Sequence, residues 1–103
     1  MATLEERGAR AVGIAWIRKE DYTALVAIFE DGDTFTDGWE AWNTRAETVE
    51  DRLKSEGVIV LRAHLDPETF PAWCTARGVD TGREGRSLFG IEFAEKQYGR
   101  NQS

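Results

Sequence analysis

The only cysteine and the only histidine of the chain have the residue types of a nucleophile and its base. Cys74 lies in the run FPAWCTARG (70–78), ten residues after His64. A nucleophilic cysteine needs a lowered pKa, a base within hydrogen-bond reach and an exposed sulfur. We expect Cys74 in mid-helix beside Phe70 and Trp73, where burial raises the pKa of a thiol. The spacing therefore predicts a core cysteine, with a thiol-dependent enzyme or redox sensor using Cys74 and His64 as the alternative.

The sequence contains no pattern of residues typical of a calcium or zinc site. Asp31, Asp33 and Asp37 invite comparison with a calcium loop, but Thr36 stands where that loop needs glycine and Trp42 where it needs glutamate. One cysteine and one histidine cannot fill most of a zinc site. We expect no metal and no cofactor.

Negative charge is concentrated in one part of the chain. The net charge is −6, and the window 20–44 holds seven acidic residues and no Lys or Arg. Such a surface repels a phosphate backbone, so nucleic acid is an unsuitable partner, whereas a basic protein is suitable. The candidate binding residues on this acidic surface are Glu30, Asp31, Asp33, Asp37 and Glu40.

Two arginines form a candidate anion site. Arg83 and Arg86 lie beside Gly82 and Gly85 at the expected start of the last helix. Free N–H groups at a helix N-terminus and the planar guanidinium group both suit phosphate or carboxylate. The alternative is that these arginines pair with the acidic window.

Length and composition predict one domain and an intracellular setting. With 103 residues, 41% of them hydrophobic, the chain can form a single core. We expect a globular domain over 11–98, a flexible segment over 1–10 and a frayed end over 99–103. The N-terminus lacks the pattern of a signal peptide, the apolar runs are too short to cross a bilayer, and one cysteine forms no internal disulfide. These features predict a cytoplasmic protein without membrane contact.

Hydrophobic periodicity predicts two strands and four helices. Alternation and β-branched content indicate strands over 11–17 and 58–65, while helical spacing indicates helices over 19–30, 37–56, 66–78 and 81–98. A hairpin at Asp31-Gly32 is an alternative to the first helix. The expected caps are Asp37 with Glu40, Asp66 with Pro67, and Thr81 with Glu84.

This element order predicts an α+β fold that is mostly helical, with a small two-stranded sheet and about four helices in the order β-α-α-β-α-α. Two strands alone are marginal, so we expect helices on one face of the sheet and a homodimer that extends the sheet. Pro71, inside the third helix, should distort its first turn, and Gly85 and Gly90 should each weaken the last helix by about 1 kcal/mol relative to alanine.

Two motifs carry a family resemblance. At WIRKEDY (16–22) and DPETFPAWCTARG (66–78) the chain resembles a group of short bacterial proteins without an assigned function. The resemblance runs from about Ile14 to Gly99 and implies helices after Tyr22 and near the C-terminus, but no activity. With no catalytic constellation in view, the expected function is a non-enzymatic protein-interaction module with an acidic surface.

Overall fold

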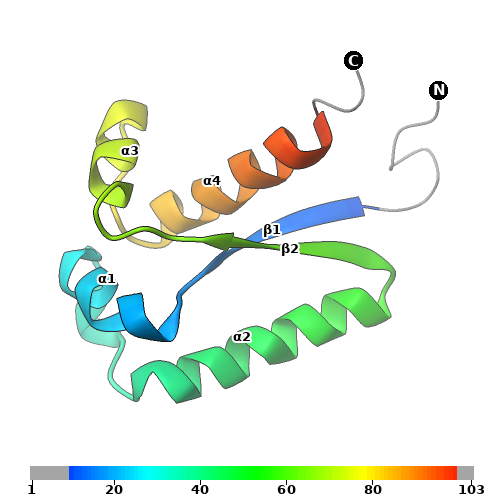
Figure 1. Ribbon diagram of the computed structural model, residues 1–103, viewed down its shortest axis with the longest axis horizontal. Coiled ribbons are helices and arrows are strands. Elements are labelled where there is room, and N and C mark those ends of the chain that lie inside the picture. Colours follow the sequence, from blue (N-terminus) through cyan, green and yellow to red (C-terminus); the bar gives the residue numbers. More distant parts are fainter. Residues whose placement is uncertain (1–9, 100–103) are drawn as a thin grey trace.

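Two parallel strands lie between two long helices in the computed structural model, which describes residues 10–99 (Figure 1). Strand β1 is Arg10–Trp16 and strand β2 is Val58–His64. They pair in register from Arg10 opposite Val58 to Trp16 opposite His64. The chain between them crosses from one end of the sheet to the other, as parallel pairing requires.

The two long helices cover opposite faces of the sheet (Figure 1). Helix α2 (Gly38–Ser55) lies on one face, where Trp42 contacts Trp16, and helix α4 (Arg83–Ala94) lies on the other. Side chains alternate along a strand, so each face receives every second residue. Ala11, Gly13, Ala15, Ile59, Leu61 and Ala63 face α4, while Val12, Ile14, Trp16, Val58, Val60, Arg62 and His64 face α2.

Short helices gather beyond the carboxyl ends of the strands. A 3₁₀ turn, Lys19–Asp21, leads into α1 (Tyr22–Ile28), and a second 3₁₀ turn is Gly32–Thr34. Helix α3 (Phe70–Arg77) follows β2, and a π-helical segment, Glu95–Gly99, continues α4. The best-buried core lies here, between α1, α3 and the residues that follow each strand: Ile17, Leu25, Phe29, Leu65, Phe70 and Cys74.

Two glycines bring α4 into backbone contact with β1. A Cβ atom at Gly13 would lie 2.0 Å from the carbonyl oxygen of Gly90, and a Cβ atom at Gly90 would lie 2.3 Å from the carbonyl oxygen of Gly13. Any side chain at either position would force the helix away from the sheet. Gly85 has a similar role against α3, because its Cβ would lie 2.9 Å from Sγ of Cys74.

The predicted fold class and element order are confirmed. The fold is α+β, mostly helical, with a two-stranded sheet and four α-helices in the described residues. The hairpin alternative is wrong, because Tyr22–Ile28 is helical. The expectation of helices on one face only is also wrong, since a parallel pair needs cover on both faces. The predicted segment 1–10 lies outside the described residues except for Arg10, and 99–103 except for Gly99.

Asp37 occupies the predicted N-cap position of α2, but none of the three predicted capping side chains bonds to the amides of its helix, because other partners take them. Asp37 accepts a hydrogen bond from Arg45, and Thr81 donates one to the carbonyl oxygen of Ile28 at 2.6 Å. Asp66 accepts a hydrogen bond from the amide of Glu68 in a turn, and α3 begins only at Phe70. Pro71 therefore lies in the first turn, where a missing N–H is tolerated and no distortion results.

The contact between Gly13 and Gly90 reverses the usual effect of a glycine-to-alanine change in a helix. Helix propensity alone predicts that Gly90→Ala stabilises by about 1 kcal/mol. We expect it instead to destabilise by about 3 kcal/mol, lowering Tm by roughly 10 °C or more, because the new methyl group meets the β1 backbone. Ser87→Ala, at an exposed position of the same helix, should change stability by less than about 0.5 kcal/mol. Thermal unfolding by circular dichroism checks both, and a stabilised Gly90→Ala variant would contradict the packing.

Candidate functional site

Core side chains fill the space directly beyond the carboxyl ends of the strands. Open parallel sheets commonly bind ligands just beyond these ends. Here Ile17 and Leu65, which directly follow β1 and β2, are 1% and 0% exposed and pack against Leu25 and Phe70. The place where a substrate would lie is therefore filled by core side chains.

Cys74 belongs to this core and does not meet His64. The thiol is 1% exposed, and burial is the main cause that raises its pKa, followed by the nearby carboxylate of Asp80. His64 is exposed at the end of β2; partial burial and then the charges of Arg18 and Arg62 lower its pKa. Within residues 10–99 no hydrogen bond joins the two side chains. The pair lacks the geometry of a nucleophile and base.

The acidic surface is partly neutralised by arginines. Asp31 accepts two hydrogen bonds of 2.8 Å from Arg86, and Asp37 accepts one of 2.9 Å from Arg45. Hydrogen bonding to Arg86 lowers the pKa of Asp31, and hydrogen bonding to Arg45 lowers that of Asp37. These two predicted binding residues are therefore already occupied within the chain.

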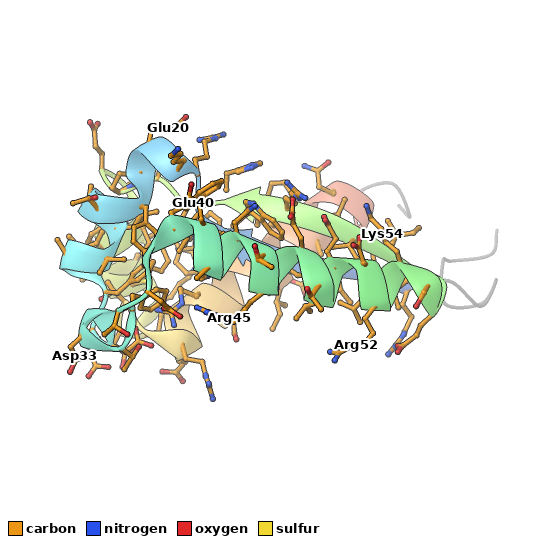
Figure 2. All side chains as sticks on the ribbon, turned by 90° about the horizontal axis from the view of Figure 1, so that it is seen from below. Glu20, Asp33, Glu40, Arg45, Arg52 and Lys54 are labelled. Atoms are coloured by element: carbon orange, nitrogen blue, oxygen red, sulfur yellow. The ribbon has the colours of Figure 1, made fainter. Side chains whose placement is uncertain are left out.

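The other acidic candidates keep exposed carboxylates. Glu30, Asp33 and Glu40 are exposed, and so is Glu20 of the same window; none of the four forms an ion pair within the part of the chain that the structure describes. Figure 2 shows Glu20, Asp33 and Glu40 at the end of the molecule that carries α1, while Arg52 and Lys54 lie toward the other end of α2. We call Glu20, Glu30, Asp33 and Glu40 the acidic end.

The predicted anion site is divided between its two arginines. Arg86 is held by Asp31 and covers two aromatic rings, with its guanidinium carbon 4.6 Å from the centre of Phe29 and 5.2 Å from that of Phe35. The pairing alternative is thus confirmed for Arg86. Arg83 is exposed and forms no ion pair with any described residue.

Two further arginine clusters were not predicted from the sequence. Arg62 of β2 donates hydrogen bonds of 2.8 and 2.7 Å to Glu50 of α2 and lies 3.9 Å above the ring of Trp16. Glu50 is only 5% exposed, and hydrogen bonding to Arg62 lowers its pKa. The sequence held a signal for this pair: Glu50 follows Trp42 and Ala46 at helical spacing, and Arg62, alternating with Leu61 and Ala63, lies on the strand face that points to α2.

The second cluster ties α3 to α4. Arg77 donates hydrogen bonds of 3.1 and 2.9 Å to Glu92 and lies 3.9 Å from the ring of Trp73, which in turn packs against Phe70 and Phe89. Trp39 has a structural contact too, because its indole N–H donates a hydrogen bond to the carbonyl oxygen of Ile17. These arginines complete a core and offer no free cation to a ligand.

The described residues contain no group of three or more His, Cys, Asp or Glu side chains placed to hold a metal ion. Among the helices of residues 10–99, none has the length and apolar character to cross a membrane. No family model, curated protein or solved structure matches the chain. The resemblance carried by the DPETFPAWC run therefore stays a prediction.

Burial of Cys74 predicts a thiol that reacts only when the protein opens. At pH 7 we expect the native protein to react with a thiol reagent at least about 100-fold more slowly than the urea-unfolded chain, because the sulfur must first be exposed. Absorbance of the released thiolate from Ellman's reagent gives both rates. Fast reaction of the native protein, with an apparent pKa below about 8.5, would contradict the core assignment.

The bond between Glu50 and Arg62 predicts a stability that falls in acid. The folded state holds the pKa of Glu50 below its unfolded value of about 4.3, so the bond contributes fully above that pH and is lost as the pH falls through the folded-state pKa. We expect Glu50→Gln to cost about 1–2 kcal/mol at pH 7, and this difference from the wild type to shrink as the pH falls below the unfolded value of about 4.3. The free energy of unfolding in urea, measured for the variant and the wild type from pH 3 to 7, tests this expectation. The control is Glu47→Gln, at an exposed carboxylate 3.9 Å from Arg62. If the stability difference between Glu50→Gln and the wild type stayed constant with pH, the role of the Glu50–Arg62 bond would be contradicted.

Proposed function

We propose that this protein is a non-enzymatic protein-interaction module that binds a basic segment of its partner at the acidic end. The observation that carries the proposal is the contrast within one region: beyond the strand ends the interior is filled, while the surface keeps four exposed carboxylates without ion pairs in the described residues. A filled interior favours recognition by the surface over conversion of an enclosed substrate.

The fixed geometry of this surface supports binding. Asp31 and Asp37 sit among the acidic residues but are held by Arg86 and Arg45, and these bonds tie the loop between α1 and α2 to both long helices. Glu30 and Asp33 thus project from a loop whose position is set before binding, and Glu40 projects from the first turn of α2, which lowers the entropy lost on association. Unpaired carboxylates also draw a basic partner in during encounter, an effect that weakens as salt increases.

Charge neutralisation tests the proposal. The variant Glu30→Gln, Asp33→Asn, Glu40→Gln should lose at least about ten-fold in partner affinity at low salt, because each rim carboxylate contributes a salt-sensitive attraction. The control Asp51→Asn, Glu56→Gln, Glu68→Gln changes the net charge equally at exposed sites elsewhere and should change affinity less than two-fold.

The measurement has two stages. Proteins captured from a lysate by the wild type, at 50 and 300 mM salt, are compared with those captured by the two triple variants, and retained candidates are titrated by calorimetry. Binding that is lost only in the first variant and falls with salt supports the proposal. Binding that is equal in both variants, or insensitive to salt, overturns it.

A further inference from the structure

The outer edge of β2 is an open sheet edge in the described residues. The amide of Leu65 donates to the carbonyl oxygen of Trp16, so the backbone groups of Leu65 point toward β1. Directions alternate along a strand, and those of Ile59, Leu61 and Ala63 therefore point to β1 as well. The other set points outward, to an edge with no neighbouring strand in residues 10–99, and consists of Val58, Val60, Arg62 and His64.

Helix α4 closes the corresponding edge of β1 but not that of β2. A Cβ atom at Gly90 would lie 2.3 Å from the outward carbonyl oxygen of Gly13 and 3.5 Å from the amide nitrogen of Ala15. At Gly57, which leads into β2, a Cβ atom would meet nothing within 4 Å. Figure 2, which looks onto α2, shows β2 alongside this helix and not hidden behind it. The edge of β2 is therefore the one at which the sheet can grow.

Apolar side chains next to this edge are incompletely covered. Ile59, Leu61 and Ala63 face α4, but that helix packs its backbone against Gly13 of β1. Ala63 is fully buried, whereas Ile59 and Leu61 are only half-buried. A strand added beside β2 would bring further apolar side chains onto this face and remove Ile59 and Leu61 from water.

A second copy of β2 matches this edge when it runs antiparallel about a two-fold axis at Leu61. All seven residues of the strand then pair, and the residues with outward backbone groups face one another, as an antiparallel ladder requires. No pair places like charges opposite each other. The facing residues are Val58 with His64, Ile59 with Ala63, Val60 with Arg62, and Leu61 with its own copy.

Neighbouring registers fit less well. With the axis at Arg62, two guanidinium groups would lie opposite each other, which is unfavourable. With the axis at Val60, Ala63 and His64 would face the turn before β2 of the other copy, where the ladder has ended. The sequence of β2 thus favours the axis at Leu61.

The position of α4 leaves room for this pairing. Because α4 lies over β1, the two β2 strands would separate the α4 helices of the two copies by three inter-strand spacings, about 14 Å. Packed helices need about 8–10 Å between their axes, so these helices do not collide. Ile59 and Leu61 of both copies would lie in the space between them.

We propose that two copies of this chain associate through the β2 edge, antiparallel about Leu61, and form a four-stranded sheet in the order β1-β2-β2-β1. Main-chain hydrogen bonds between Val60 and Arg62 of the two copies flank the axis. The wider sheet replaces a marginal two-stranded one and closes its open edge. The pairing uses none of the carboxylates of the acidic end, so the proposal does not rest on the proposed function.

Mass and amide exchange of the full-length protein test the pairing. Sedimentation equilibrium should give twice the mass of the chain. In hydrogen exchange followed by ¹⁵N NMR, the amides of Val60 and Arg62 should exchange within about ten-fold of those of Ile59, Leu61 and Ala63, because every amide of β2 is then bonded. In a monomer protection would alternate, and Val60 and Arg62 would exchange at least about 100-fold faster than the residues bonded to β1.

Cysteine variants test the axis. Two cysteines that face each other at a non-hydrogen-bonded pair are close enough for a disulfide, so Leu61→Cys should cross-link to its copy under mild oxidation. Ile59→Cys on the same face and Val60→Cys on the other face do not meet their own copies and should cross-link at least about ten-fold more slowly. The native Cys74 is buried and does not compete.

The outcomes separate the possibilities. Doubled mass, uniform protection along β2 and preferential cross-linking of Leu61→Cys support the proposal. The mass of a single chain, or doubled mass with alternating protection, which another interface would give, overturns it. Faster cross-linking of Val60→Cys or Ile59→Cys overturns the axis at Leu61. Mass and exchange use the wild-type protein, so they decide the pairing even if a cysteine variant fails to fold.

Discussion

The contact between Gly13 and Gly90 is the constraint on which the arrangement of this small domain depends. It brings the backbone of α4 against β1, closer than any pair of side chains would allow. From that position α4 reaches two other parts of the structure. Arg86 reaches Asp31 in the loop after α1, while Phe89 and Glu92 reach Trp73 and Arg77 of α3. A helix displaced by one methyl group would have to re-form all of these contacts.

Guanidinium groups cover aromatic rings here, a role that apolar side chains have in larger domains. Arg62, Arg77 and Arg86 each lie over an aromatic ring and are each held edge-on by a carboxylate. Stacking removes the ring face from water, and the carboxylate fixes the guanidinium in place. A chain too short to bury all its aromatic rings thus covers them with hydrogen-bonded cations, and arginines that look like ligand-binding residues in the sequence become structural.

Local patterns in the sequence predicted the helices and strands. The helix caps and the side-chain pairs depend on contacts that those patterns do not contain. Alternation over 11–17 and helical spacing over 37–56 are properties of a few neighbouring residues, and both predictions agree with the structure within a residue or two. The predicted capping bonds are absent because Asp37 bonds to the side chain of Arg45 in its own helix and Thr81 bonds to Ile28, far away in the sequence. In the candidate site, burial of Cys74 followed from its apolar neighbours. The pairing of Glu50 with Arg62 and the contact of Gly13 with Gly90 depend on how α2 and α4 cross the strands, which no local pattern encodes.

The parallel register also has a consequence for the order of folding. Arg10 pairs with Val58 and Trp16 with His64, so every rung of the ladder joins residues at the same large sequence separation. No residue pair of the sheet can form at a lower entropic cost than the others, because the loop of intervening chain must close before the first inter-strand hydrogen bond forms. During synthesis β1 leaves the ribosome long before β2 and has no strand to pair with until α2 has followed it. The sheet at the centre of the molecule is therefore assembled late, around helices that can form earlier.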